Sequence, residues 1–262
     1  MQTNLDAKTV EGFGEEWSRF DQAELDEAEL REEFERYFKV FPWNILPGDA
    51  VGFDMGCGSG RWAKIAAERC GTLHCIDASE AALSVAKQNL AGIDNAVFHR
   101  ASVEAIPLDD GSMDFGYSLG VLHHVPDTAE GMRSCVSKLK ANAPFLVYLY
   151  YAFDNRPIWF RIIWRFSDIF RGIICGLPFR AKAFITDIIA VLIYFPFAKL
   201  SLTLEKLGLE VDVLPLSAYR KHSFYTMRTD ALDRFGTRLE QRFTRQQITA
   251  MMEDAGLERV EF

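Results

Sequence analysis

The chain has 262 residues, of which 49% are hydrophobic and 25% charged, and its formal net charge is −8. This length fits one core domain with an elaboration. The acidic balance argues against a nucleic-acid binder, because phosphate binding requires a basic surface. The five cysteines form no CxxC pair and show no metal-type spacing, which favours reduced thiols in a cytoplasmic protein.

The N-terminal residues 1–47 predict an acidic helical arm. Apolar residues recur among many glutamates between residues 25 and 40, as on one side of a helix. Pro42 and Pro47 mark the end of this arm. Its polar beginning is unlike a signal peptide.

In residues 48–152, short apolar runs alternate with helical segments. The expected strands lie at 51–55, 72–76, 96–99, 113–119 and 144–151, with helices at 61–69, 79–90 and 127–139. This alternation predicts an α/β fold with a doubly wound, mostly parallel sheet. The fifth run is apolar throughout, which favours a central strand. The pattern returns in residues 244–262, as a helix to about residue 255 and a strand at Arg259–Phe262.

A glycine-rich turn is expected between the first strand and the following helix. Residues 52–60 read Gly-Phe-Asp-Met-Gly-Cys-Gly-Ser-Gly. Glycines let a ligand approach the backbone, where the N–H groups of a helix N-terminus face an anionic group. The dinucleotide fingerprint is GxGxxG, whereas these glycines are spaced GxGxG, with Asp54 two residues before the first. Asp77 ends the second strand, where a carboxylate can bind ribose hydroxyls or cap the next helix near Ser79.

These motifs resemble those of the class I S-adenosylmethionine (SAM)-dependent methyltransferases of the small-molecule type. Two further segments are similar to that family: residues 101–107 to its adenine-contacting segment, and residues 114–125 to its fourth-strand motif. Family members usually carry Asp where Ser102 stands. The resemblance implies a Rossmann-like methyltransferase fold, SAM as cofactor and S-adenosylhomocysteine as product.

The resemblance also implies a set of cofactor contacts. Residues 13–20 are similar to a leader that caps the cofactor in some members, with Arg19 paired to the SAM carboxylate; the alternative is an amphipathic helix whose Trp17 packs on the core. Asp54 would receive the SAM ammonium. The expected contacts are Trp17, Arg19, Asp54, Gly56, Cys57, Gly58, Gly60, Asp77, Ala78, Ser102, Val103 and Leu119.

The reaction expected from this resemblance is in-line transfer of a methyl group to an O, N or C acceptor. His123 and His124 follow the fourth strand, and either is a candidate general base. The alternative is that one of them caps the next helix and the other packs on the sheet. Adjacent histidines point apart, so no metal site is predicted.

Tyr151, which follows the fifth strand, is a third candidate for the reaction. The candidate substrate contacts are Asn155, Arg156, Tyr219, His222 and Tyr225. The charged cluster around the last three suits a loop over a site or an ion-pair network.

Residues 153–243 read as an inserted helical cap. Two apolar helices are expected at 158–174 and 184–195, the second ending at Pro196. Neither reaches the ~18–20 residues that span a bilayer. Residues 151–200 are basic, with seven Lys/Arg against three Asp. Three interpretations stay open: a cap over an apolar substrate pocket, a peripheral membrane contact through residues 158–200, or a homodimer interface.

Together these patterns predict a cytoplasmic SAM-dependent methyltransferase, free or at a membrane, acting on a small or lipid-linked molecule. The alternatives are a protein of the same fold with non-methyl-transfer chemistry, and a non-catalytic partner that binds SAM, oligomerises or docks on a membrane.

Overall fold

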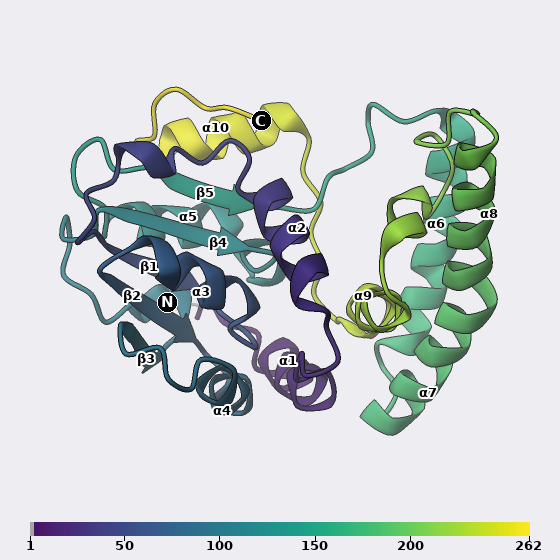
Figure 1. The fold of residues 1–262 in the computed structure, drawn as a ribbon, viewed down its shortest axis with the longest axis horizontal. Coiled ribbons are helices and arrows are strands. Elements are labelled where there is room, and N and C mark those ends of the chain that lie inside the picture. Colours follow the sequence, from purple (N-terminus) through teal and green to yellow (C-terminus); the bar gives the residue numbers. More distant parts are fainter. Residues whose placement is uncertain (1–2) are drawn as a thin grey trace. The chain divides into compact units, whose positions relative to one another are not determined.

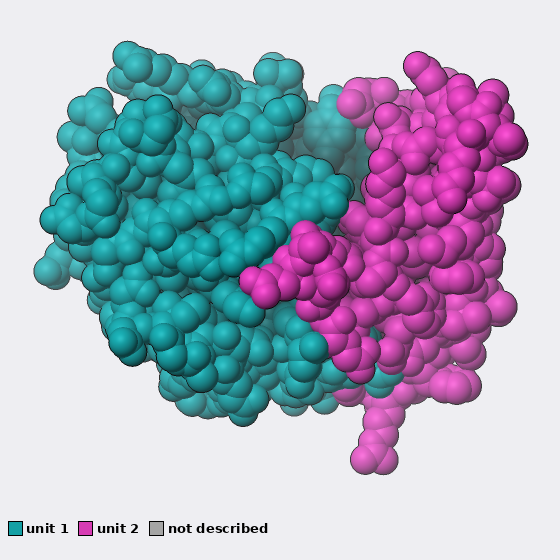
Figure 2. All heavy atoms as spheres, in the orientation of Figure 1, with its two compact units in different colours: residues 1–23, 30–154, 239–262 teal, residues 24–29, 155–238 magenta. Residues whose placement is uncertain are grey.

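The computed structural model describes residues 3–262; residues 1 and 2, the first two of the predicted arm, lie outside the described residues. The chain forms two compact units (Figure 2). Unit 1 comprises the N-terminal residues up to Ala23, residues 30–154 and residues 239–262. Unit 2 comprises residues 24–29 and 155–238.

Unit 1 is built on a five-stranded sheet whose order is β3-β2-β1-β4-β5, with every neighbouring pair parallel (Figure 1). The strands are β1 (Val51–Met55), β2 (Thr72–Asp77), β3 (Ala96–Arg100), β4 (Phe115–Leu119) and β5 (Phe145–Tyr148). The chain order reverses at β1, so the carboxyl ends of β1 and β4 flank a topological switch point, where open α/β sheets bind ligands. The predicted α/β class with a parallel sheet is confirmed.

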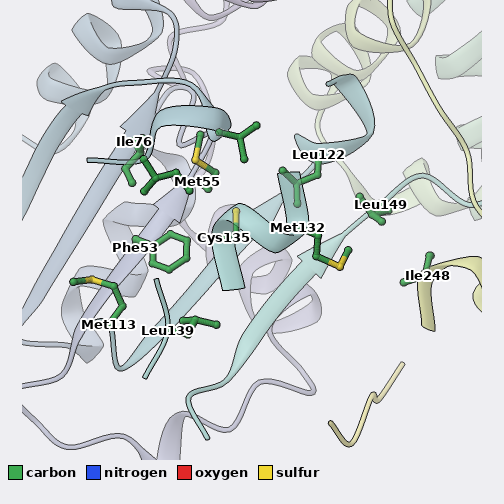
Figure 3. Close-up of a cluster of buried hydrophobic side chains, with 12 residues drawn as sticks. Phe53, Met55, Ile76, Met113, Leu122, Met132, Cys135, Leu139, Leu149 and Ile248 are labelled. Carbon is green, nitrogen blue, oxygen red and sulfur yellow. The ribbon is translucent and has the colours of Figure 1, made fainter. Parts of the chain in front are cut away.

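The two faces of the sheet are packed differently. On one face, the core includes Phe53, Met55 and side chains from α5 (Thr128–Val136) and α10 (Arg245–Asp254), such as Met132 and Ile248 (Figure 3). On the other face, an aromatic cluster from α2 (Glu27–Tyr37), the turn after it and the short helix η1 (Trp43–Ile45) contacts two β4 side chains; its ring contacts join Phe34, Phe38, Phe41, Trp43, Phe115 and Tyr117.

Side-chain caps fix the starts of four helices of unit 1. Asp6 accepts from an N–H of α1 (Ala7–Arg19), and Ser79 does the same for α4 (Glu80–Asn89). Asp127 caps α5, and Thr244 forms a capping box with Gln247 at the start of α10. In contrast, α3 (Arg61–Ala66) begins directly at Gly60 without a side-chain cap and is extended by the short helix η2 (Ala67–Arg69).

Two strand predictions are wrong. The fifth strand is an edge strand rather than a central one, because its outer neighbour is reduced to a single bridge between Tyr151 and Phe243. An apolar run marks a strand covered on both faces and does not reveal its place in the sheet. Residues 259–262 form no strand, since Arg259 has a left-handed φ of +57° that breaks an extended segment.

Unit 2 is helical. Its elements are α6 (Ile158–Ile174), α7 (Phe179–Ile189), the π-helical turn Ala190–Tyr194, α8 (Phe195–Lys206), η6 (Ser217–Lys221) and α9 (Phe224–Gly236). The bounds of α6 are those predicted from the sequence. The cluster that packs these helices together contains Ile174, Ala190, Tyr194, Ala198, Met227, Ala231 and Phe235.

The second apolar helix is much longer than predicted. Residues 179–206 form one helix of 28 residues, which by length and composition alone is able to cross a bilayer. Pro196 does not end it. A proline lacks the N–H that would bond to the carbonyl one turn earlier, and the π-helical turn before it shifts the pattern, with Phe195 N–H donating to the carbonyl of Ala190. The expectation that neither helix reaches a spanning length is therefore corrected.

Candidate active site

A pocket opens at the carboxyl ends of β1, β2 and β4, and every residue that lines it belongs to unit 1. Its empty volume is about 850 Å³, which includes solvent at the mouth. One wall is formed by the turn after β1, the end of β2 and the segments after β3 and β4; the opposite wall is formed by α1 and the residues before it. The lining residues are Asn4, Leu5, Thr9, Val10, Phe13, Trp17, Met55, Gly56, Cys57, Gly58, Ser59, Arg61, Trp62, Asp77, Ala78, Ser102, Val103, Leu119, Gly120, Val121, His124 and Val125.

The glycine turn needs glycine at each of its three positions. Gly56, Gly58 and Gly60 have φ values of +81°, +55° and +77°, a region that favours glycine. The neighbours are also close: a Cβ built on Gly56 would lie 2.3 Å from Val121, and one on Gly60 would lie 2.4 Å from Leu90. The turn brings backbone rather than side chains to the pocket wall at Gly56 and Gly58, whereas Gly60 faces α4 and does not line the pocket.

Asp77 connects the glycine turn to α4. Its carboxylate accepts from the N–H of Gly58 at 2.9 Å and from the N–H of Ser79 at 2.8 Å. Burial raises the pKa of Asp77, and these backbone donors partly offset the rise. Ser79 rather than Asp77 is the N-cap residue of α4. Asp77 thus faces the pocket with its orientation fixed by two backbone donors.

Asp54 lies beneath the turn and not on the pocket wall. Its side chain is only 1% exposed, and its Oδ2 is buried without a hydrogen-bond partner. Burial raises the pKa of this carboxyl to about 8, while the Tyr117 hydroxyl lowers it and the charge of Asp77 raises it further. The structure therefore does not bring Asp54 together with the pocket-lining residues that were expected to hold a ligand.

Five other expected cofactor contacts line the pocket: Cys57, Ala78, Ser102, Val103 and Leu119. Cys57 is buried, and its pKa is raised well above the ordinary value by contact with the Cys75 thiol and by burial. This thiol therefore stays protonated at neutral pH.

Helix α1 covers the pocket through Phe13 and Trp17. The segment before it is tied down by Asn4, whose amide donates to the carbonyl of Asp127 at 2.9 Å and accepts from the N–H of Asp127 at 2.7 Å. Gly14 packs against α4, where an added Cβ would lie 2.5 Å from Ser79 Oγ. Arg19, expected to bind the ligand carboxylate, is exposed near the end of α1 and does not line the pocket.

Arg61 was missed by the sequence reasoning. It is the only Lys or Arg among the described residues that line this pocket. Its guanidinium lies 5.7 Å from the ring centroid of Trp17 and 4.4 Å from that of Trp62. Arg61 is the first residue of α3 and directly follows the glycine turn. This position in the sequence could have identified it as a residue of the site.

The two candidate histidines occupy different environments. His123 is 0% exposed, and its ring nitrogens have no hydrogen-bond partner among the described residues. Its ring packs against that of Tyr150 at an angle of 32°, with 3.9 Å between the ring centroids. Burial, with the nearby His124 and Arg242, holds the pKa of His123 well below its ordinary value. His124 lines the pocket, and its Nδ1 lies 2.6 Å from the carbonyl oxygen of Leu239. Of the two, only His124 lines the pocket, with its Nε2 buried in the pocket wall.

The other candidates do not line this pocket. Tyr151, half-buried, belongs to unit 1, and a hydrogen bond to Asp154 raises the pKa of its hydroxyl. The remaining five belong to unit 2: Asn155, Arg156, Tyr219, His222 and Tyr225. Arg156 donates to the carbonyl of Asp212 at 3.4 Å, and Tyr225 is only 9% exposed.

The charged cluster around these residues forms ion pairs inside unit 2. Arg220 pairs with Glu205 at 2.9 Å and Arg228 with Asp187 at 3.0 Å. Of the two interpretations of this cluster, the ion-pair network is the one that the contacts support.

Comparisons with known proteins agree with this geometry. Residues 53–147 match the family model described as a methyltransferase domain. The chain is similar to the ubiquinone biosynthesis O-methyltransferases of Marinobacter nauticus (36% identical over 100 residues, 36% of this chain and 41% of that protein) and of Hahella chejuensis (34% over 102 residues, 37% and 42%). It thus spans about two-fifths of the length of these curated relatives.

A similar solved structure is a SAM-dependent methyltransferase of Thermotoga maritima, described as a possible histamine N-methyltransferase. It is 14% identical, with a TM-score of 0.47 and coverage of 94% of this chain and 82% of that one. Residues 53–147, which contain the GxGxG turn and the acid at the end of β2, thus match a methyltransferase domain.

Proposed function

We propose that the chain is a SAM-dependent methyltransferase that methylates a hydroxyl oxygen of a small or lipid-linked molecule. The observation that carries the proposal is the meeting of the glycine turn, Asp77 and α1 around one pocket at the switch point of the sheet. The oxygen acceptor is taken from the names of the relatives, which are O-methyltransferases.

The glycine turn and the polar groups that line the pocket fit SAM. Gly58 presents only backbone to the pocket, and the Trp17 ring packs beside it, where a side chain would collide. Asp77 presents a fixed carboxylate, as ribose hydroxyls require.

The residues proposed to hold SAM come from both walls. The backbone of the glycine turn would face the methionine end, Asp77 the ribose, and the Ser102–Val103 segment the adenine. Arg61, in place of Arg19, would pair with the ligand carboxylate, because it is the cation on the wall. When bound, SAM supplies an activated methyl group, so the protein's tasks are alignment and exclusion of water.

His124 is proposed as the general base for the acceptor hydroxyl. With its Nδ1 2.6 Å from the Leu239 carbonyl oxygen, the proton sits on Nδ1 and the lone pair on Nε2. Nε2 would take the proton that the acceptor hydroxyl loses as its oxygen gains the methyl group. The pocket wall near His124 also carries Phe13, Val121 and Val125, so we propose an acceptor with an apolar ring or chain.

The proposed location is the cytoplasm. All five cysteines are free, and four of them are buried. This usage fits a compartment that keeps thiols reduced.

Methyl transfer from labelled SAM to a panel of small phenols and catechols tests the proposal. The expected result is a methyl ether formed together with S-adenosylhomocysteine, and loss of this activity in Asp77→Ala. Tight SAM binding without product from any member of this panel, or from a second panel of amine and carbon acceptors, would instead support a non-catalytic SAM-binding protein.

A further inference from the structure

Helix 179–206 has the opposite polarity to that of a helix in a water-soluble protein. Apart from Tyr194, which is 5% exposed, the side chains that it buries are small: Ala183, Thr186, Ala190, Ala198 and Ser201 are each at most 1% exposed. Large apolar side chains are exposed instead, with Phe184 and Leu192 both at 67%. Water-soluble helices bury their large apolar residues, whereas membrane helices pack through small residues and turn large ones to lipid.

Helix α6 repeats this inversion. Phe166, Phe170 and Ile173 are 62%, 60% and 63% exposed. The inward side carries charge: Asp168 pairs with Arg171 at 2.7 Å and with Arg234 of α9 at 3.5 Å. Helix α6 therefore turns ion-paired groups inward while Phe166, Phe170 and Ile173 face outward, and its one buried apolar residue among those described is Ile174, near its end.

Both helices turn their polar sides toward α9. From helix 179–206, Asp187 pairs with Arg228 of α9, and Lys182 donates to the carbonyl of Gly236. The apolar face consists of the exposed large side chains of α6 and helix 179–206: Ile158, Trp159, Ile162, Ile163, Phe166, Ile169, Phe170, Ile173, Phe184, Ile188, Val191, Leu192, Ile193, Phe195, Phe197 and Leu200. Ordinary monomers expose apolar side chains singly, whereas these side chains are concentrated on the surface of two helices. Such a surface indicates a binding partner.

The charges around the apolar face are cationic. Arg161, Arg165, Arg180 and Lys199 are exposed, and none of them pairs with a carboxylate among the described residues. The three acids of α6 and helix 179–206 are Asp168, Asp187 and Glu205, and each already pairs with an arginine of unit 2. A symmetric contact with a second copy would bring the same unpaired cations together, whereas anionic lipid headgroups would neutralise them.

We propose that the apolar face docks on an anionic lipid bilayer, with α6 and helix 179–206 lying in the interface. Their apolar side chains would enter the acyl boundary, and the four cations would meet the headgroups. An orientation in the plane keeps the α9 side, with its ion pairs, in water. This inference does not depend on the proposed methyl transfer, since the surface lies in unit 2 and the pocket in unit 1.

Flotation of the purified full chain with vesicles tests the proposal. One set of vesicles contains phosphatidylcholine alone, and the other contains phosphatidylglycerol as well. The wild-type protein should float with the anionic vesicles, and less so as salt rises. Phe166→Asp combined with Phe170→Asp should lower the bound fraction at least tenfold. Arg161→Gln combined with Arg165→Gln should remove the preference for anionic vesicles.

The matched control is Ile45→Asp, because Ile45 is 61% exposed but lies in unit 1. This variant should float as the wild type does. Circular dichroism confirms that each variant is folded, and neither SAM nor an acceptor is needed. Absence of wild-type binding at low salt, or unchanged binding of the double-Asp variant, would overturn the proposal. A stable dimer in solution that the double-Asp variant dissociates, with no vesicle binding, would assign the apolar face to a second copy instead.

Discussion

The Trp17 indole of α1 lies directly against Gly58 of the glycine turn, so that a Cβ built on Gly58 would come within 2.8 Å of Trp17 Nε1. Helix α1, which covers the pocket, and the glycine turn, which forms part of its wall, are therefore in contact at this point. Only glycine at residue 58 permits both this contact and the φ of +55°.

Gly58→Ala should lower the free energy of unfolding by about 1–3 kcal/mol, since it adds backbone strain and an overlap with Trp17. In a Trp17→Ala background the overlap disappears, so the same substitution should cost less. Urea unfolding of the four proteins measures this coupling. Gly111→Ala is the control for strain alone, because Gly111 has a φ of +63° and nothing within 4 Å of an added Cβ. Equal costs of Gly58→Ala in both backgrounds would show that the contact is absent.

The buried Asp54 predicts a pH dependence of stability. Its pKa is raised by burial from 3.8 to about 8, so the folded protein keeps a proton that the unfolded chain releases. The stabilising contribution is complete below about pH 4 and is lost as pH rises toward 8, by up to about 1.4 kcal/mol per pH unit. Asp54→Asn imitates the protonated acid and should be more stable relative to the wild type at pH 8 than at pH 5.

Urea unfolding at several pH values measures this difference without ligand. Asp114→Asn is the control. The pKa of Asp114 is lowered by Lys140 and by the N–H of Val51, although partial burial opposes this, and the group stays ionised throughout the range. Parallel pH profiles for the wild type and Asp54→Asn would contradict a raised pKa at Asp54.

The two histidines predict separable variants. His124→Gln should reduce kcat by about 10²–10⁴-fold, the usual contribution of a general base, with little change in SAM affinity. His123→Gln should instead affect stability, because His123 is buried against Tyr150 and does not line the pocket. The measurement is kcat against pH with the best acceptor of the panel. A normal kcat in His124→Gln would remove this residue from the chemistry.

Asp168 predicts a stability effect inside unit 2. It pairs with Arg171 and Arg234, whose side chains are 15% and 14% exposed. Asp168→Ala would leave two poorly solvated cations side by side, and should cost about 1–3 kcal/mol in urea unfolding. Glu130→Ala, which removes an exposed pair with Arg133, should change stability by less than about 1 kcal/mol. Equal effects would contradict the assignment.

The sequence predicted the parts of the site that depend on local spacing. The glycine turn and Asp77 each follow a strand, so the parallel sheet brings them to one edge. Arg19 and Arg61 could not be assigned in this way. Helical periodicity does not show whether Arg19 faces the pocket, and Arg61 begins a helix whose sequence has no feature that marks a binding residue.

Other differences arise from tertiary context. The position of β5 at the edge depends on how residues 151 and 243 pair, which the apolar run itself does not encode. Pro196 predicted a helix end because a proline lacks an N–H, but the π-helical turn before it accommodates that loss. The result is one continuous helix of 28 residues in unit 2.

Calorimetric titration of SAM and S-adenosylhomocysteine into the wild type, Asp77→Ala and Asp77→Asn tests the central claim most directly. Thermal unfolding of both variants checks that losing the bonds to Gly58 and Ser79 leaves them folded. The account predicts micromolar binding of both ligands to the wild type, and at least a tenfold weaker affinity in the folded variants. Absence of binding of either ligand to the folded wild-type protein would contradict it.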